Sequence, residues 1–378
     1  MRIGVPKERG RHEHRVGLSP YAVRQLSAQN HTVFVEKGAG VTAHFLDQDY
    51  EKAGAQIVYR TEEVYQRADF VCKVGKLSAD EVGLLKEGQV VCAFHHLAVM
   101  PKETVLKLMQ KEVTLIGYEV IRDERGDLPI LTPFSEMAGQ MAVHLGAYYL
   151  ATESGGRGVL LGAVPGIPPA TVLVLGAGTA GSSAARQAAA CGAHVIVVGT
   201  DLNRLRQLSH DLPGRVVTVL AGGPERLQPY IGICDVLIGA VLIPGARAPE
   251  VVSEEMVRGM KSGAVILDLS IDQGGCVATS RPTSPDRPTF IQHGVVHYCV
   301  PNMTASIPRT ASRALANVVL PYLLAHGRKG LDEALRDDPG LAAGVYLYRG
   351  QMVNQAVGEA LQIPATPLGE LLKRRYET

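Results

Sequence analysis

Short apolar segments alternate with longer amphipathic segments from the beginning of the chain. Runs rich in β-branched residues, such as Thr-Val-Phe-Val at 32–35, are typical of buried strands, and the polar segments between them have the length of crossover helices. Ser19 precedes one such segment and is a suitable N-cap. The expected strands are 3–5, 32–35, 69–74, 89–94 and 113–118, and the expected helices are 20–28, 61–67, 78–85 and 102–110. This alternation predicts a parallel α/β sheet.

A second α/β unit follows a longer helical segment and a stretch rich in turns. Apolar residues recur at helical spacing over 135–154, which predicts one long helix with its apolar side on the core. Glycines and prolines are then frequent over 155–169. Further strands are expected at 171–175, 194–198, 235–238 and 264–267, and further helices at 310–326 and 331–336. The pattern predicts two domains, one formed by 1–133 and 307–378 and the other by 134–306.

The composition narrows the kinds of partner. Of the 378 residues, 46% are hydrophobic and 20% are charged, which is typical of a globular protein. Lys and Arg number 38 against 37 Asp and Glu. The resulting net charge of +1 gives no reason to expect nucleic acid or an anionic membrane surface as a partner. The expected partner is a small molecule.

The cysteines and the charge-free stretches indicate a cellular setting. Six cysteines occur without any C-x-x-C pair, and most lie within apolar runs, as free thiols do in a reducing compartment. No charged residue occurs over 158–185, but Pro165, Pro168 and Pro169 interrupt that stretch, which argues against a lipid-exposed helix. The amino terminus has no apolar signal core. We therefore expect a cytoplasmic protein, and we expect no metal site because the histidines lack ligand-like spacing.

The clearest chemical motif is a glycine-rich loop after the strand at 171–175. Its sequence, Gly176-Ala-Gly178-Thr179-Ala180-Gly181, stands between a predicted strand and a predicted helix, as a dinucleotide-binding loop requires. The first glycine makes the turn, the second lets the backbone approach a pyrophosphate, and the third lets the helix pack closely on the strand. The alternative is that these small residues only pack a tight strand–helix unit. We favour a nicotinamide dinucleotide site.

The end of the next strand bears on the choice between NAD and NADP. An acidic residue here usually grips the ribose hydroxyls of NAD, but this chain has Gly199-Thr200-Asp201. Without a carboxylate at the first position, repulsion of a 2′-phosphate is weaker, and Thr200, Arg204 and Arg206 are close enough in sequence to bind one. NADP therefore stays open beside NAD. In the alternative, Asp201 or the backbone takes over the ribose contact.

Longer strings in both halves of the chain resemble those of one enzyme family. They are Met1-Arg-Ile-Gly-Val-Pro-Lys-Glu, Arg15-Val, Phe94-His-His96-Leu-Ala, Pro133-Phe-Ser135-Glu-Met-Ala-Gly139, 158–166, 239–245, Ile271-Asp272-Gln-Gly-Gly275, 297–300 and Asn302-Met303. Several of them are long and permit few variants. Over essentially its whole length the chain resembles the alanine dehydrogenase family, which is related to the NAD domain of the proton-translocating transhydrogenase.

The resemblance implies a fold, a reaction and a set of site residues. It implies two Rossmann-like, doubly wound parallel-sheet α/β domains with an active-site cleft between them, 134–306 being the dinucleotide-binding domain and the other the substrate domain. The implied reaction is the reversible NAD(P)-dependent oxidative deamination of L-alanine to pyruvate and ammonium, by a homo-oligomer that is usually a hexamer. Arg15 would bind the substrate carboxylate, His96 would be the acid or base at the carbonyl oxygen, and Asp272 would assist proton transfer. Residues implied to lie along the cofactor are Ser135, Gly178, Val241, Leu242, Asn302 and Met303.

Residue chemistry agrees with these roles. Water must add to the iminium that hydride removal leaves, and a group that titrates near neutrality, as His does, suits the proton transfer. Arg presents a fork that matches a carboxylate. Asp272 follows an apolar strand, which is a cleft-edge position in a doubly wound sheet. Outside these motifs, Arg15 would more often be a surface residue and His95-His96 a buried pair.

One departure from the family pattern falls on the substrate site. Members carry Lys-Val-Lys-Glu-Pro where this chain has Lys73-Val-Gly75-Lys76-Leu, so Gly75 replaces the second lysine, which holds the substrate carboxylate. Lys73 or Lys76 then remains to assist Arg15. Lys76 can do so only if the chain bends at Gly75, because a shift of one residue in a strand reverses the side-chain direction. Loss of the anchor would cost about 2–4 kcal/mol of substrate binding.

Smaller departures lie near the same sites. Phe134, Pro301 and Thr304 stand where the family usually has Met, Ala and Pro. Two alternatives to alanine oxidation therefore stay open. One is the same hydride chemistry on another 2-amino or 2-oxo acid, and the other is a nucleotide-binding homologue with weak or lost activity.

Overall fold

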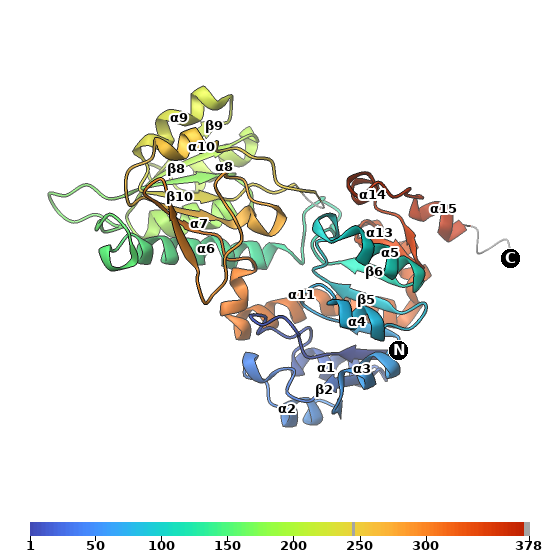
Figure 1. Cartoon of the computed structure of the whole chain (residues 1–378). Helices are drawn as coiled ribbons and strands as arrows, with labels where there is room; N and C mark the ends of the chain where they lie inside the picture. The colour runs from blue at the N-terminus through green and yellow to red at the C-terminus, as the bar shows by residue number, and fades with distance from the viewer. Residues whose placement is uncertain (244–245, 374–378) are drawn as a thin grey trace. The chain divides into compact units, whose positions relative to one another are not determined.

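The chain divides into two compact units (Figure 1). The computed structural model describes residues 1–243 and 246–373. Unit 1 comprises 1–133 and the described part of 305–378, so both ends of the chain contribute to it. Unit 2 comprises 134–243 and 247–304. Which unit binds which molecule stays a prediction.

Unit 1 is built on an eight-stranded sheet within the described residues, in the order β15-β14-β6-β5-β4-β1-β2-β3. Its strands are β1 (Arg2–Val5), β2 (Thr32–Glu36), β3 (Gln56–Val58), β4 (Phe70–Cys72), β5 (Val90–Ala93), β6 (Thr114–Gly117), β14 (Val345–Tyr348) and β15 (Gln351–Met352). The pairs from β3 to β6 are parallel, and β14 runs antiparallel to β6 and β15. Strand order reverses between β1 and β4. Doubly wound sheets bind ligands at such a switch point, at the carboxyl ends of the strands.

Helices cover both faces of this sheet. On one face, α3 (Thr61–Arg67), α4 (Ala79–Leu84), α5 (Lys102–Gln110) and α14 (Gln355–Leu361) bury apolar side chains against β4, β5, β6 and β14. The long helix α11 (Pro308–Lys329) lies on the other face with α1 (Pro20–Ala28) beside it. The remaining helices of the unit are α2 (Asp47–Lys52), α12 (Leu331–Asp337), α13 (Pro339–Ala343) and α15 (Leu368–Lys373).

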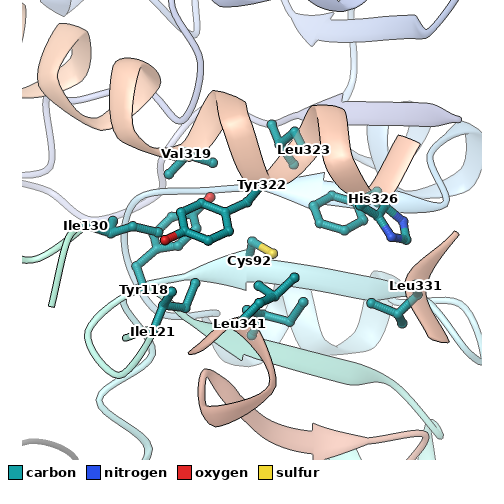
Figure 2. Close-up of a pocket in the computed structure, with 12 residues that line it drawn as sticks. Cys92, Tyr118, Ile121, Ile130, Val319, Tyr322, Leu323, His326, Leu331 and Leu341 are labelled. Atoms are coloured by element: carbon teal, nitrogen blue, oxygen red, sulfur yellow. The ribbon is translucent and has the colours of Figure 1, made fainter. Parts of the chain in front are cut away.

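A small cavity lies between α11 and the sheet. Figure 2 shows Tyr322 and His326 of α11 on one side of it and Cys92 and Tyr118 on the other. Its volume is about 20 Å³, which is room for roughly one water molecule, and its walls are mostly aliphatic side chains and aromatic rings. Cavities with such walls stay dry, so this one belongs to the core and not to a ligand site.

Unit 2 has a seven-stranded sheet within the described residues, β12-β13-β11-β10-β7-β8-β9, whose six parallel strands repeat the order of the parallel strands of unit 1. Its strands are β7 (Thr171–Leu175), β8 (His194–Gly199), β9 (Val216–Leu220), β10 (Val236–Gly239), β11 (Val265–Asp268), β12 (Thr289–Gln292) and β13 (Val295–Tyr298). Only β12 is antiparallel to its neighbour. The second switch point therefore lies between β7 and β10.

Helices also cover both faces of the second sheet. On one face lie α6 (Thr132–Tyr149), α7 (Thr179–Ala190) and α8 (Leu202–Asp211), and on the other lie α9 (Pro224–Ile233) and α10 (Glu254–Arg258). Helices α6 and α7 pack with their backbones in contact, because a β-carbon on Gly139 would lie 2.3 Å from the carbonyl oxygen of Ala180. This close packing fixes the helix that follows the glycine loop.

The predicted fold class is confirmed, with corrections to single elements. Helices 20–28, 61–67 and 102–110 have the predicted bounds. The strand predicted over 69–74 ends at Cys72, and the long helix predicted over 135–154 ends at Tyr149, before a 3-10 turn at Thr152–Ser154. The tail is not only helical, since it adds β14 and β15 to the first sheet. These strands are too short to show an alternating pattern.

The charge-free segment 158–185 does not form a single helix. It contains β7 and the first half of α7, with turns before them. Among the described residues, no helix combines the length and the apolar character that a membrane span needs.

Candidate functional site

Arg15 lies at the switch point of unit 1. Its segment runs along the end of β4, where a β-carbon on Gly17 would lie 2.4 Å from the carbonyl oxygen of Cys72. The guanidinium is buried, with 3% of the residue exposed, and donates from Nε and Nη2 to both oxygens of Glu13, at 2.7 and 2.5 Å. The fork that matches a carboxylate therefore already holds one from its own chain.

Lys73 follows the last residue of β4 and is enclosed by carboxylates. Its Nζ lies 3.0 Å from Oε2 of Glu8 and 2.6 Å from Oε1 of Glu81, and the side chain has no exposed surface. Burial raises the pKa of Glu8 above its ordinary value. At Glu81 burial is the largest cause and acts in the same direction, but the Lys73 ammonium and the hydrogen bonds from Lys73 and Ser78 together outweigh it and lower the pKa. This geometry favours a role for Lys73 in holding the strand end together, and its contact with substrate stays a prediction.

Gly75 lies beside the carboxylates of this cluster. The chain bends there, directly after β4. A β-carbon on Gly75 would lie 3.5 Å from Oε2 of Glu8 and 3.9 Å from Oε2 of Glu13, both ordinary contact distances. A lysine at this position would therefore start next to the carboxylate that holds Arg15. Lys76, one residue further, is exposed, and its role as a substitute anchor stays a prediction.

His96 lies just beyond β5 and begins the 3-10 turn Leu97–Val99. Its backbone is left-handed, with φ 47° and ψ 48°, and its N–H donates to Oε1 of Glu119 at 2.6 Å. The ring is half-buried and stacks on Phe94 at a centroid distance of 6.3 Å. Within the described part of the chain, Nδ1 of His96 is buried and has no hydrogen-bond partner. A ring nitrogen in this state is available to give or take a proton.

The neighbouring His95 has a different environment. It is fully buried, and its Nε2 lies 3.2 Å from the carbonyl oxygen of Val91. Burial lowers the pKa of His95, so its ring is neutral at physiological pH. Nδ1 of His95 is likewise buried without a hydrogen-bond partner among the described residues, so the two histidines differ in exposure: His96 is partly exposed and His95 is not.

The glycine loop of unit 2 has the geometry of a phosphate cradle. Gly176 has φ 104°, and a β-carbon on it would lie 2.3 Å from the carbonyl oxygen of Ala240. A β-carbon on Gly181 would lie 1.9 Å from the carbonyl oxygen of Gly176. At Gly178, in contrast, the nearest atom would be Nη1 of Arg204, at 3.6 Å. Packing therefore requires the outer two glycines but not Gly178, which leaves open space at the amino end of α7, as a pyrophosphate would need.

Thr179 and Ala180 are the first two residues of α7. The helix begins after Gly178, which has no side chain to cap it. The first amides of a helix lack partners within it and form an anion site when no side chain caps them. The residues predicted to bind the pyrophosphate thus form one continuous loop and helix start.

Gly199 is the last residue of β8 and has little room for a side chain. A β-carbon there would lie 3.0 Å from the β-carbon of Ala177 and 3.3 Å from Cδ2 of Leu205. Thr200 follows and is exposed. Gly199, which replaces the acidic residue usual at this position, thus lies where close packing leaves little room for a side chain.

The side chain of Asp201 accepts hydrogen bonds from the first amides of α8. Its Oδ1 accepts from the N–H groups of Asn203 at 2.9 Å and of Arg204 at 3.2 Å, and its Oδ2 lies 3.5 Å from Nε of Arg204. The carboxylate is thus bound to its own helix. Arg204 is more than half exposed, and its Nη1 lies near Gly178. Arg204 therefore places a positive charge beside the glycine loop.

Asp272 and Asn302, predicted from separate motifs, lie together. The N–H of Asn302 donates to Oδ1 of Asp272 at 2.8 Å, and Asn302 is left-handed, with φ 52°. Asp272 is half-buried in the 3-10 turn Leu269–Gln273 after β11. Both residues therefore occupy the edge of the sheet where strands end.

The other predicted cofactor residues differ in exposure. Val241 is held by Ser270, whose Oγ accepts its N–H at 3.1 Å and donates to its carbonyl oxygen at 2.8 Å. Leu242 is 44% exposed. Ser135 is half-buried on α6, and Met303 is buried in the core of unit 2. Whether they contact a cofactor stays a prediction.

Sequence reasoning missed the carboxylates that organise unit 1. Glu8 and Glu13 lie in the amino-terminal segment, where only Arg15 was predicted to be a site residue. Glu119 follows β6. Tyr346, 227 residues after Glu119, donates to it at 3.0 Å. An acid two residues before Arg15 is visible in the sequence, but no local signal connects Tyr346 with Glu119.

No group of three or more His, Cys, Asp or Glu side chains among the described residues is arranged to hold a metal ion.

Two doubly wound sheets, one with a glycine cradle and the other with a buried arginine and a half-buried histidine at its strand ends, define a two-domain protein of the dinucleotide-fold class. Comparison with known proteins gives the family. The alanine dehydrogenase/PNT N-terminal domain matches residues 4–138, and the C-terminal domain of the same family matches residues 142–355. The chain belongs to the alanine dehydrogenase/PNT family.

Individual relatives match along the whole chain. An alanine dehydrogenase of Mycobacterium tuberculosis is 42% identical over 372 residues, which cover 98% of this chain and all of the relative. A solved structure of an L-alanine dehydrogenase has a TM-score of 0.88 and 42% identity, covering 96% of this chain and 99% of that one. A transhydrogenase from Sinorhizobium meliloti has a TM-score of 0.79 and 25% identity, covering 93% and 100%. The resemblance inferred from the motifs is confirmed.

Proposed function

We propose that the chain is an oxidoreductase of the alanine dehydrogenase type, which interconverts L-alanine with pyruvate and ammonium. The observation that carries the proposal is that the segment of the buried Arg15 runs along the carboxyl end of β4 while the half-buried His96 lies just beyond the neighbouring strand β5. Full-length identity to alanine dehydrogenases supports it. The substrate needs a carboxylate anchor and a proton carrier, and these two side chains are of the required types.

A nicotinamide dinucleotide fits the glycine loop. Gly178 has open space where the backbone would approach a pyrophosphate, and Gly176 and Gly181 hold that backbone in place. When bound, the nicotinamide ring accepts or supplies the hydride of the reaction. The loop and the first turn of α7 would hold the pyrophosphate through their amides.

The chain's own residues would manage binding and proton transfer. Arg15 exchanges the carboxylate of Glu13 for that of the substrate, keeping a bidentate contact. After hydride removal from the α-carbon, water adds to the iminium, and His96 takes a proton from that water. Ammonia leaves as the carbonyl forms. Asp272 would hold a proton or water at the edge of unit 2.

For the cofactor, we propose NAD, with use of NADP as well. Gly199 removes the acid that would repel a 2′-phosphate, and Arg204 lies beside the glycine loop. Asp201 disfavours the use of NADP, since its negatively charged carboxylate is close to Arg204. The balance between these charges sets the ratio of NADH to NADPH use.

Gly75 supports a second candidate, the same chemistry on another 2-amino or 2-oxo acid. The position offers open space beside Glu8 and Glu13 where the family places a lysine. A substrate larger than alanine would occupy that space. A nucleotide-binding homologue without turnover is the weaker alternative, because Arg15, His96 and Asp272 are all retained.

We further propose a cytoplasmic homo-oligomer, with a hexamer as the form that the family resemblance implies. The six cysteines are free thiols, as in proteins of reducing compartments. Light scattering of the purified chain measures the oligomeric state, and a monomer at micromolar concentration would overturn that part of the proposal.

The test of the proposed function is the oxidation rate of NADH and of NADPH with pyruvate and ammonium. Turnover that requires both pyruvate and ammonium supports the alanine reaction. His96→Asn should lower kcat by about 100- to 10,000-fold with folding unchanged. Turnover only with a larger 2-oxo acid establishes the second candidate. Cofactor binding without turnover on any 2-oxo acid overturns the enzyme proposal.

A further inference from the structure

His96 holds a backbone conformation that is uncommon for residues other than glycine, although His adopts it more often than most of them. Its φ of 47° lies in the left-handed region, where a side chain is disfavoured. Such conformations persist only when neighbouring groups over-determine them. The direction of the imidazole from the strand end depends on this conformation, so whatever holds the backbone also aims the ring.

Glu119 supplies the contact that holds it. Its Oε1 accepts the N–H of His96 at 2.6 Å, and only 1% of the residue is exposed. Charge-assisted hydrogen bonds from a backbone amide to a buried carboxylate are strong and directional. Within the described residues, Oε2 of Glu119 is buried without a partner. In the structure, the carboxylate of Glu119 thus accepts hydrogen bonds through Oε1, the oxygen that contacts His96.

Tyr346 of β14 fixes this oxygen from the other side. Its hydroxyl donates to the same Oε1 at 3.0 Å, and 1% of the residue is exposed. The ring reaches this place only because β6 ends in a glycine: a β-carbon on Gly117 would lie 2.2 Å from a ring carbon of Tyr346. The N–H of His96 and the hydroxyl of Tyr346 thus donate to the same oxygen of Glu119, although Tyr346 is distant from the other two residues in the chain.

We propose that Glu119 and Tyr346 are positioning residues, which hold His96 in its left-handed conformation and so aim its imidazole at the substrate. The inference rests on the proposed function for its kinetic consequence, but the structural consequence does not depend on it. Without the carboxylate contact, the backbone of His96 relaxes toward ordinary φ values and the ring leaves the strand end. Binding of the cofactor, which concerns unit 2, is unaffected.

The first test compares two tyrosines of one strand. Tyr346→Phe removes the hydroxyl that contacts Glu119 and keeps the ring beside Gly117. Tyr348→Phe is the matched control, because its hydroxyl donates to a carboxylate of Asp332 at 2.8 Å, away from His96. We expect Tyr346→Phe to lower kcat about tenfold with KM for reduced cofactor within threefold, and Tyr348→Phe to leave kcat within twofold. Equal kcat in the two variants would overturn the assignment of Tyr346.

The second test separates the carboxylate contact from simple stability. Glu119→Gln keeps an oxygen that accepts from both His96 and Tyr346, whereas Glu119→Ala removes it. We expect kcat to fall about 100-fold in Glu119→Ala and to recover to within tenfold of the wild type in Glu119→Gln. If the two variants lose activity equally while both stay folded, Glu119 does not act through this contact.

Hydrogen–deuterium exchange gives a readout that needs no turnover. The amide of His96 should exchange slowly in the wild type and in Tyr348→Phe, faster in Tyr346→Phe, and fastest in Glu119→Ala. Unchanged exchange in Glu119→Ala overturns the inference even if activity is lost. If the wild type turns over no substrate, the proposed function fails, and the order of exchange rates still decides the positioning roles.

Discussion

The two sheets of this protein share a strand order but carry opposite chemistry at their switch points. In unit 1 the strand ends bear buried charges, with Lys73 between two glutamates and Arg15 on a third. In unit 2 the corresponding ends bear glycines, two of which touch backbone so closely that no β-carbon fits. One topology therefore serves two purposes. It carries buried charges at the strand ends of one unit and closely packed glycines at those of the other.

The difference predicts different kinds of sensitivity. A buried charge cluster tolerates no loss of a single member, because the partner that remains is left uncompensated. The outer two glycines of the cradle tolerate no added atom, because a β-carbon there would meet backbone. Substitutions in unit 1 should therefore act through charge, and those in unit 2 through volume.

The largest effect is expected from Lys73→Met, which leaves Glu8 and Glu81 buried without their cation. We expect the free energy of unfolding to fall by about 3–5 kcal/mol in denaturant titrations. Lys86→Met is the control, since Lys86 is partly exposed and 3.9 Å from Asp69, and should cost less than about 1 kcal/mol. Equal stability of Lys73→Met and wild type would show that the cluster does not hold the strand end.

The same variant has a predicted pH dependence. In wild type the pKa of Glu81 is lowered, so its contribution to stability is present at neutral pH and is lost as the pH falls. In Lys73→Met the unpaired carboxylates have raised pKa values, so the variant loses stability as the pH rises through them. The second effect makes the stability difference larger at pH 8 than at pH 5, whereas the first acts only in acid, below the ordinary pKa of a glutamate. A difference that grows toward acid would contradict this account.

Volume in the cradle of unit 2 is tested by Gly178→Val. Because packing leaves open space at this position, the unliganded protein should keep its Tm, whereas the dissociation constant for NADH should rise about 100-fold. Gly232→Ala is the control, with its nearest atom 3.8 Å away, and should leave binding unchanged. Unaltered NADH affinity in Gly178→Val would place the pyrophosphate elsewhere.

Gly75→Lys restores the lysine that the family carries at this position of unit 1 and tests its contribution to substrate binding. A lysine there starts beside Glu8 and Glu13 and restores a second cation at the carboxylate site. We expect kcat/KM for pyruvate to rise about 30-fold. Gly83→Lys adds the same charge at an open, exposed position and should change nothing. A fall in kcat/KM in Gly75→Lys would favour a larger natural substrate.

The smallest effect is expected from Gly199→Asp, which adds both charge and volume in unit 2. The new carboxylate should shift the ratio of NADH to NADPH activity about tenfold toward NADH. Because the β-carbon meets Ala177 at 3.0 Å, Gly199→Ala is needed to isolate the steric part. If both variants shift the ratio equally, volume and not charge sets the preference.

Sequence patterns predicted the parts of the fold that repeat a local rule. Helix α1 begins after the N-cap Ser19, and α4 after Ser78, which forms a capping box with Glu81. The glycine loop was predictable because its spacing between a strand and a helix is a local sequence pattern, and the contact of Gly181 with Gly176 lies within the loop itself. Such features need no knowledge of distant segments.

What the sequence did not reveal depends on long-range contacts. The strand β14 is four residues long and buried throughout, so its pattern does not differ from that of a short helix. At the end of β4, Lys73 contacts Glu8, which lies 65 residues away in the chain. The N–H of His96 likewise contacts Glu119, which follows β6 and is bound by Tyr346 of β14, and no local pattern connects these residues.

The placement of β14 has a consequence for synthesis of the chain on the ribosome. Tyr346 is made 227 residues after the glutamate that it contacts, which at ~5–20 residues per second is roughly 11–45 s. During that interval the nascent first unit presents β6 as an open edge, and the segment after β5 lacks its final support. All of unit 2 is therefore translated before β14 joins the first sheet, and the contact of Tyr346 with Glu119, beside His96, is among the last contacts of unit 1 to form.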